Sequence, residues 1–326
     1  MPTFKSPVDG TSLYYRYYEP LTCASDPVQP LTLVFLHGWP MSSRMWDHFF
    51  IPLVQAHRFH VLAPDRRGFG NSDWNAGPTS RTLVSGSAVD SSTPRTTAVS
   101  WQTLTDDLTA LLTALDIGPF AFVAASMGCP ESVLTYLSSA YVRANCRAFV
   151  WIGPNMPYNI RSDACPAAPL SEVWDFLSAG LSGPVAKAFA AEQLTSVFRV
   201  DLAGNELEER VLRFYERLVC QADPVALVRM PEIFRDDLVA ELTRFAESTG
   251  AEKMPIMVLH GGADTGMPLE ASGRVIKEML PWADLRVYEN AGHGLYLTHA
   301  DRVLKDIIEI VARKPGESSV DEITGK

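Results

Sequence analysis

Ser126 stands where a short apolar segment gives way to a helical pattern. The segment Phe120–Ala124 has the residue types of a buried strand, and the run AASMG occupies residues 124–128 directly after it. Small residues two positions before and after a serine suit a tight strand–turn–helix, because strand and helix then pack closely. Such a turn presents the hydroxyl as a nucleophile at a helix N-terminus, where N–H groups stabilise an oxyanion. The alternative is that Ser126 only caps the helix.

Two further polar residues follow later segments of strand character. Asp264 comes after Met254–His260 in the run GGAD, and His293 comes after Asp284–Glu289 in the run NAGHG. The carboxyl ends of parallel strands meet at one edge of a sheet, so these groups are expected to share one crevice with Ser126. Taken singly, Asp264 fits a turn residue or cap, and His293 fits a structural histidine. Together with Ser126 they supply nucleophile, base and orienting carboxylate.

The run LHGWP at residues 36–40 predicts a second contributor to this crevice. Gly38 permits a close backbone approach, and the N–H groups of Trp39 and Met127 together form a candidate oxyanion hole. His37 is interpreted as a structural hydrogen-bonding residue rather than a second catalytic base. The run DRRGFGNS at residues 65–72 lacks the Gly-Lys-Ser/Thr ending of a phosphate loop, so we interpret it as an architectural turn.

Strand-like and helix-like patterns alternate along most of the chain, which predicts an α/β protein with a mostly parallel, twisted sheet covered by helices on both faces. The clearest helices are expected over Trp101–Leu115, with Ser100 as N-cap, and over Asp301–Val311. The first two strands are expected to be neighbours. The expected strands are Leu13–Tyr18, Leu31–Leu36, Phe59–Pro64, Phe120–Ala124, Arg147–Ile152, Met254–His260 and Asp284–Glu289.

The same patterns divide the chain into a core in two parts and an insertion. Residues 1–153 and 254–313 are expected to form the α/β core, and residues 154–253 an inserted helical cap. Residues 74–99 read as a long surface loop and 314–326 as a disordered tail. Helical patches in the cap are expected at Leu170–Leu181, Pro184–Val200, Glu206–Cys220 and Asp236–Ser248.

Composition narrows the class of protein. Of the 326 residues, 47% are hydrophobic and 20% are charged, which is enough apolar material for a large core. The net charge of −10 comes without a basic block, so nucleic acid and anionic membranes are not expected as partners. No run is long enough to span a bilayer and no secretory signal is visible, which predicts a cytoplasmic protein. The cysteines lack a CxxC pair and are expected to be free thiols: Cys23, Cys129, Cys146, Cys165 and Cys220.

Several longer motifs carry a family resemblance that extends over about residues 8–311. They are LHGWPMSSRMWD, APDRRGFGNSD, AASMGC, LHGGADTGMP and NAGHGLYLTHAD. With the chain order Ser, Asp, His, the sequence resembles α/β-hydrolase fold enzymes, and among them the cofactor-free haloperoxidase branch of perhydrolases and arylesterases. The resemblance implies that Ser126 is the nucleophile, with Asp264 and His293 as its partners. It further implies backbone oxyanion donors at Trp39 and Met127, and no metal, haem or flavin.

The sequence departs from that family pattern at three places. Ala124 replaces the first glycine of the turn, and Cys129 stands where the family usually has another glycine. The 74–99 segment is longer than the usual connection. Alanine is small enough for the turn to form, so we expect the turn to be kept.

These observations predict a serine hydrolase that cleaves an ester, thioester or lactone through an acyl-enzyme on Ser126. A serine here excludes the aspartate-nucleophile chemistry of dehalogenases and epoxide hydrolases of this fold. The expected substrate is a small to medium, mainly apolar molecule. A homo-oligomer is compatible with the sequence. The alternatives are perhydrolysis, lyase or condensation chemistry with His293 as base, and non-catalytic ligand binding. The expected pocket residues are Trp39, Met127, Met156, Trp174 and Leu295.

Overall fold

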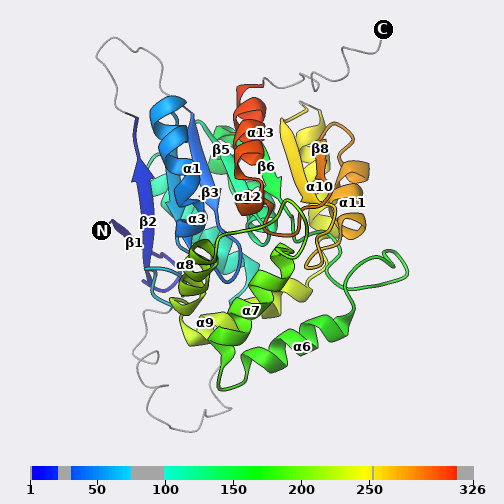
Figure 1. Cartoon of the computed structure of the whole chain (residues 1–326). Coiled ribbons are helices and arrows are strands. Elements are labelled where there is room, and N and C mark those ends of the chain that lie inside the picture. The colour runs from blue at the N-terminus through cyan, green and yellow to red at the C-terminus, as the bar shows by residue number, and fades with distance from the viewer. Residues whose placement is uncertain (1, 21–30, 75–98, 252, 314–326) are drawn as a thin grey trace, which may run out of the picture.

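The apolar segments of the chain pair into one eight-stranded sheet with the order β1-β2-β4-β3-β5-β6-β7-β8 (Figure 1). The structure, a computed structural model, describes residues 2–20, 31–74, 99–251 and 253–313. Strand β1 pairs antiparallel with β2, and β2 pairs antiparallel with β4. The six strands β3 to β8 run parallel to one another, which confirms the predicted mostly parallel α/β sheet. The strands are β1 (Thr3–Lys5), β2 (Ser12–Tyr18), β3 (Thr32–Leu36), β4 (His60–Pro64), β5 (Phe120–Ala125), β6 (Cys146–Ile152), β7 (Ile256–Gly261) and β8 (Asp284–Tyr288).

The expectation that the first two predicted strands, Leu13–Tyr18 and Leu31–Leu36, are neighbours was wrong. Strand β2 pairs with β4, and β3 lies between β4 and β5. The cause lies in burial. Every residue of β3 is buried, so this strand needs parallel neighbours on both sides, whereas β2 is only partly buried and lies beside the edge strand β1.

Alternate side chains of the central strands point to two helical layers. Phe35 of β3 packs on Trp46, beside helix α1 (Asp47–Ile51), which lies in front of the sheet in Figure 1 with α13 (Ala300–Ala312). Phe149 of β6 packs in the other direction on Tyr136 of α4 (Gly128–Ser138) and Phe245 of α10 (Val239–Gly250). The sheet is therefore covered on both faces.

Helix α3 (Trp101–Ala114) packs against α4 and begins as predicted. The Ser100 hydroxyl accepts a hydrogen bond from the Thr103 N–H at 3.2 Å, as an N-cap does. The helix predicted over Asp301–Val311 is likewise present as α13.

Between β6 and β7 the chain forms helices, and among the described residues 154–251 and 253 no element is a β-strand. We call residues 154–253 the helical insertion. Figure 1 shows α6 to α9 gathered below the sheet, whereas α10 packs on α4 in the layer that covers it. The helices are α6 (Ser171–Leu181), α7 (Ala186–Phe198), α8 (Glu209–Cys220), α9 (Pro224–Arg229) and the 3-10 turn η4 (Met230–Arg235), followed by α10.

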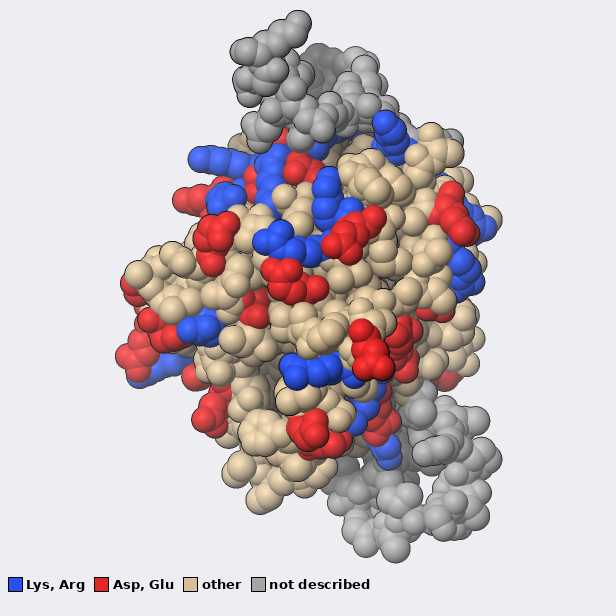
Figure 2. All heavy atoms as spheres, turned by 90° about the vertical axis from the view of Figure 1, so that its right-hand side faces the viewer, with Lys and Arg blue, Asp and Glu red and all other residues tan. Residues whose placement is uncertain are grey.

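Some expectations fall outside the described residues: most of the 74–99 loop, the 314–326 tail and Cys23. The other cysteines are free thiols. Within the described part of the chain, no helix combines the length and apolar character needed to cross a membrane. Basic and acidic side chains are interspersed over the face shown in Figure 2.

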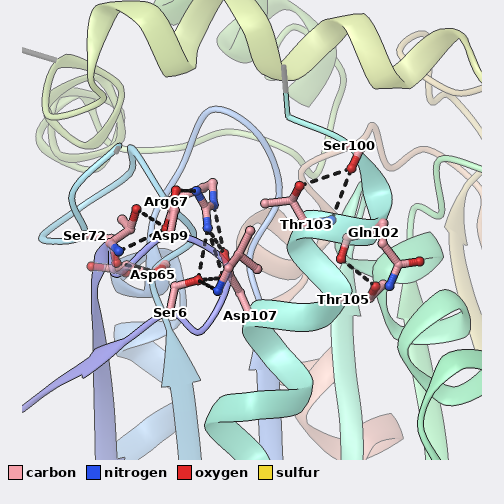
Figure 3. A network of polar contacts seen from close by, with 12 residues as sticks. Ser6, Asp9, Asp65, Arg67, Ser72, Ser100, Gln102, Thr103, Thr105 and Asp107 are labelled. Atoms are coloured by element: carbon pink, nitrogen blue, oxygen red, sulfur yellow. Dashed lines mark hydrogen bonds and ion pairs between the residues drawn. The ribbon is translucent and has the colours of Figure 1, made fainter. Parts of the chain in front are cut away.

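A buried polar network fixes the loop that follows β4 (Figure 3). The Arg67 guanidinium donates to both oxygens of Asp107 on α3, at 2.8 and 3.0 Å, and to Asp9 at 2.9 Å. Ser6 also donates to Asp107, at 2.5 Å. The side chains of Arg67 and Asp107 are only 5% and 9% exposed, so their charges compensate each other away from solvent.

We expect Arg67→Met to lower the free energy of unfolding by about 3–5 kcal/mol, because it leaves the Asp107 carboxylate buried without its counter-charge. Urea denaturation followed by circular dichroism measures the loss. The double variant Arg67→Met/Asp107→Leu removes both charges and should recover part of the stability. A single variant as stable as the wild type would contradict this view of the network.

Candidate active site

Ser126 occupies the tight turn between β5 and α4, as the strand–turn–helix pattern predicted. Its backbone has φ of +52°, in the left-handed region that non-glycine residues rarely adopt. Two backbone hydrogen bonds hold it there: Ser126 N–H donates to the carbonyl of Ile152 at 3.0 Å, and Cys129 N–H donates to the carbonyl of Ser126 at 3.0 Å. The strained residue is held by its surroundings, as strained residues at functional sites are.

Two glycines allow the turn to approach the end of β3. A Cβ at Gly128 would lie 2.7 Å from the carbonyl oxygen of Leu36, closer than real Cβ contacts. A Cβ at Gly38 would lie 3.2 Å from the Cβ of Ser126. The backbone at Gly38 is therefore directly beside the Ser126 side chain, and Trp39 N–H follows one residue later.

The residues that depart from the family pattern are accommodated beneath the turn. Ala124 is fully buried, and the Cys129 thiol, also fully buried, donates to the Ala124 carbonyl at 3.3 Å. Burial raises the pKa of the Cys129 thiol, so the sulfur remains protonated. Cys129 thus fills the space under the start of α4 as a neutral side chain.

Trp39 follows the glycine that lies beside the Ser126 side chain, and Met127 follows Ser126 in the turn. Within the described residues, neither backbone N–H donates a hydrogen bond. An N–H that serves as an oxyanion donor needs to be free in this way.

His37 holds the loop that carries Trp39. Its Nε2 accepts from the Arg66 N–H at 3.0 Å, which places the imidazole proton on Nδ1, and Nδ1 donates to the Gly38 carbonyl at 2.9 Å. Burial, with a contribution from the Arg66 charge, lowers the pKa of His37 well below its usual range. Both ring nitrogens are thus engaged with backbone groups, which agrees with the predicted structural role.

The Arg66 guanidinium joins three segments behind the serine turn. It donates to the His37 carbonyl and, at 2.5 Å from Nε, to Glu131 in the first turn of α4. Both side chains of this ion pair are 4% exposed. The loop after β3, the loop after β4 and the start of α4 are therefore tied together by one buried charge.

The structure brings Asp264 and His293 together from loops after β7 and β8. His293 Nδ1 donates to Asp264 Oδ2 at 2.7 Å. The other carboxylate oxygen, Oδ1, accepts from the N–H groups of Gly266 and Met267, each at 2.9 Å. The Asp264 side chain is fully buried, whereas that of His293 is 15% exposed. Asp264 therefore orients the imidazole through Nδ1, and part of the His293 side chain remains exposed.

The two groups shift each other's pKa in opposite directions. Burial alone lowers the pKa of His293, but the charge of Asp264 and its hydrogen bond outweigh burial, so the net shift is upward. Burial alone raises the pKa of Asp264, but the charge of His293 and the hydrogen bonds it accepts outweigh burial, so the net shift is downward. The pair is arranged to stabilise an imidazolium beside a carboxylate.

A second buried histidine, which the sequence analysis did not single out, lies behind Asp264. His260 Nε2 donates to the Met267 carbonyl at 2.9 Å and lies 3.8 Å from Asp264 Oδ2. Burial lowers the pKa of His260. This hydrogen bond ties His260 to the turn whose N–H groups bind the Asp264 carboxylate.

The helical insertion also holds the His293 loop. His293 N–H donates to the carbonyl of Val197 near the end of α7, at 2.8 Å. The Asn205 amide, in the turn after α7, donates to the Asn290 carbonyl at 2.8 Å. The position of His293 therefore depends on α7 as well as on the sheet.

Ser126 and His293 line one pocket of about 280 Å³, which lies between the loops at the end of the sheet and the helical insertion. Of the predicted pocket residues, Trp39 and Trp174 line it. The other three, Met127, Met156 and Leu295, are buried outside its lining. Further apolar lining comes from Val173, Phe176, Leu177 and Phe234, and polar lining that the sequence analysis missed comes from Asn155, Gln193, Ser196 and Thr265.

Aromatic rings form one wall of this pocket. Phe234 makes edge contacts with Trp39 and Trp174, with ring centroids 6.0 and 5.9 Å apart. The indole N–H of Trp39 donates to the Leu227 carbonyl at 3.3 Å, and that of Trp174 donates to the Asn159 carbonyl at 2.7 Å. We call Trp39, Trp174 and Phe234 the aromatic wall. With their N–H groups satisfied by backbone, the two indoles offer apolar ring surface to a ligand.

The arrangement is suited to nucleophilic catalysis at a carbonyl. It combines a serine on a strained turn, an imidazole oriented by a buried carboxylate, and two unpaired N–H donors beside the serine. In the described part of the chain, no group of three or more His, Cys, Asp or Glu side chains is placed to hold a metal ion.

The sequence and the fold were compared with protein families, with known sequences and with solved structures. A family model described as the α/β hydrolase fold matches residues 32–300. The chain is 27% identical over 305 residues to non-heme chloroperoxidase CPO-A1 of Kitasatospora aureofaciens, covering 93% of this chain and 97% of that protein. It is 24% identical over 306 residues to the bifunctional esterase/perhydrolase DCH of Acinetobacter calcoaceticus, with coverage of 93% and 97%. The bromoperoxidase structure from Bacillus anthracis superposes with a TM-score of 0.77 at 22% identity, over 96% of this chain and 99% of that one.

The electrostatics of the Asp264–His293 pair can be tested directly. In the wild type, the His293 imidazole should titrate above the ordinary histidine value of 6.5. In Asp264→Asn the pKa of His293 should fall below 6.5, because burial then acts without the compensating charge. NMR titration of the histidine ring protons gives both values. Equal values in the two proteins would show that Asp264 does not control the imidazole.

Proposed function

This chain belongs to the α/β-hydrolase fold family, and from that premise we propose that it is a serine hydrolase acting through an acyl-enzyme on Ser126. Its proposed substrates are esters, thioesters or lactones of small to medium, mainly apolar compounds. The observation that carries the proposal is the shared pocket of Ser126 and His293, with His293 held by the buried carboxylate of Asp264.

In the proposed reaction, His293 takes the proton of the Ser126 hydroxyl as the oxygen attacks the substrate carbonyl. The carboxylate of Asp264 fixes the imidazole and stabilises the imidazolium that forms. The N–H groups of Trp39 and Met127 bind the oxyanion of the tetrahedral intermediate. Protonated His293 then releases the leaving group, and a water molecule activated by His293 hydrolyses the acyl-enzyme and restores the serine.

The pocket supports an apolar acyl or aromatic group as the recognised part of the substrate. Its volume of about 280 Å³ suits a small ligand. The aromatic wall supplies ring surface whose polar atoms are already satisfied. We propose that the helical insertion acts as a cap, since α6, α7 and η4 supply most of the lining that does not come from the sheet loops.

Perhydrolysis is the second candidate use of this site. The curated relatives are named chloroperoxidases, haloperoxidase and esterase/perhydrolase. In that reaction hydrogen peroxide replaces water as the acceptor of the acyl group on Ser126, so that the product is a peracid. The same acyl-enzyme serves both reactions, and product analysis with and without peroxide separates them.

Kinetics of single and double variants test the proposed mechanism. On p-nitrophenyl esters, Ser126→Ala and His293→Ala should each lower kcat by about 10⁴-fold or more, and the double variant should lose little further activity, because the two groups act as one unit. Ser196→Ala, a serine change on α7 in the same pocket, serves as the matched control and should keep most of the activity.

Two results would contradict the mechanism. Full activity in Ser126→Ala would remove the serine nucleophile from the reaction. A reaction that survives Ser126→Ala but is lost in His293→Ala would identify His293 as a base in lyase or condensation chemistry instead.

A further inference from the structure

Gly38 carries the loop that brings the Trp39 N–H beside the nucleophile. A Cβ at Gly38 would lie 3.9 Å from Oγ of Ser126, so the loop comes close to the attacking atom. The Trp39 N–H belongs to the same rigid peptide group as the Gly38 carbonyl. Its direction is therefore set by the two peptide groups that meet at Gly38. Because glycine allows many backbone conformations, these groups keep one orientation only where their polar atoms are held.

The peptide group between Gly38 and Trp39 is held through its carbonyl. The Gly38 carbonyl accepts from the Met41 N–H at 3.0 Å and from Nδ1 of His37 at 2.9 Å. In a trans peptide the N–H points away from the carbonyl, so these two bonds direct the Trp39 N–H to the opposite side. Within the described residues that N–H donates no hydrogen bond, as an oxyanion donor requires.

The peptide group between His37 and Gly38 is held by side chains at both of its polar atoms. The His37 carbonyl accepts from the Arg66 guanidinium, and the Gly38 N–H donates to Sδ of Met45 at 3.4 Å. Gly38 is buried, and among the described residues its N–H has no other acceptor. The thioether is a weak acceptor, but it satisfies a backbone N–H that is costly to bury unpaired.

Met45 is itself fixed through its backbone. Its N–H donates to the Ser42 carbonyl at 3.0 Å, and its carbonyl accepts from the Tyr215 hydroxyl of α8 at 2.9 Å. Met45 is also fully packed, with 1% of its surface exposed. The sulfur therefore meets Gly38 from a backbone that is held by the helical insertion as well as by the loop after β3.

We propose that Met45 is a positioning residue for the hydrolysis, whose thioether holds the Gly38 N–H and thereby the oxyanion donor of Trp39. The inference rests on the proposed function, because it assigns Met45 to the stabilisation of a tetrahedral intermediate. An apolar side chain of similar volume fits the same space but accepts no hydrogen bond. The loop then loses one of the bonds that orient the Trp39 N–H, while the packing around it is kept.

Two methionine-to-leucine variants separate the sulfur contact from packing. Met45→Leu removes the acceptor, and Met41→Leu is the matched control, since Met41 is also 1% exposed and its sulfur forms no hydrogen bond with the described residues. On p-nitrophenyl butyrate, Met45→Leu should lower kcat by about 10-fold with KM unchanged, because an oxyanion donor acts in the transition state. The loss should be smaller than the roughly 10²–10³-fold of a deleted donor, since the Trp39 N–H remains. Met41→Leu should keep both constants near their wild-type values.

Hydrogen exchange gives a second readout that needs no turnover. The Gly38 amide should exchange at least about 10-fold faster in Met45→Leu than in the wild type or in Met41→Leu, because its hydrogen bond is gone. NMR of isotopically labelled protein follows this amide. The two variants should have similar Tm values, since leucine conserves the volume of methionine.

The outcomes are distinguishable. Equal kcat values in the two leucine variants, or an exchange rate of the Gly38 amide that does not depend on Met45, would overturn the proposal. A loss of kcat in Met45→Leu that comes with a large drop in Tm would assign Met45 to core packing alone and would overturn it as well. A wild type that hydrolyses no ester would overturn the proposed function instead, and the exchange rates would still decide whether Met45 holds the loop.

Discussion

The buried charge of Arg66 is the interaction on which the geometry around Ser126 depends. It joins the carbonyl of His37 to the carboxylate of Glu131, so that the end of β3 and the start of α4 are held against each other. Gly128 permits that contact because any side chain would collide with the Leu36 carbonyl. The same contacts fix the two segments that carry the proposed oxyanion donors, Trp39 and Met127, before a substrate arrives.

The second half of the site is assembled from parts that lie far from the first in the sequence. The carboxylate of Asp264 is held by backbone N–H groups and braced by His260, and it orients His293. The His293 loop is bonded in turn to the end of α7. Since α7 also lines the pocket, the element that shapes the substrate space also positions the proposed base. A change in α7 is therefore expected to alter the position of His293 as well as the pocket lining.

The sequence predicted the parts of the site that follow from position along a strand. Asp264 and His293 each follow a strand, and parallel topology alone brings such loops together. Strand order and side-chain direction were not predictable in this way. The neighbours of β3 are decided by burial across the whole sheet, and the packing of the turn leaves Met127 fully buried and outside the pocket lining. Asn155 follows β6 and obeys the same strand-end rule, but only the packed structure shows that it lines the pocket together with Ser126.

The proposed mechanism depends on activation of Ser126 by His293, and a fluorophosphonate probes this activation without a known substrate. We expect one adduct per chain in the intact mass, located on Ser126 by peptide mapping and absent from Ser126→Ala. The rate of labelling should rise with pH through the raised pKa of His293, because only the neutral imidazole accepts the serine proton. A folded protein that forms no adduct at neutral pH, or one labelled at another residue, would show that His293 does not activate Ser126.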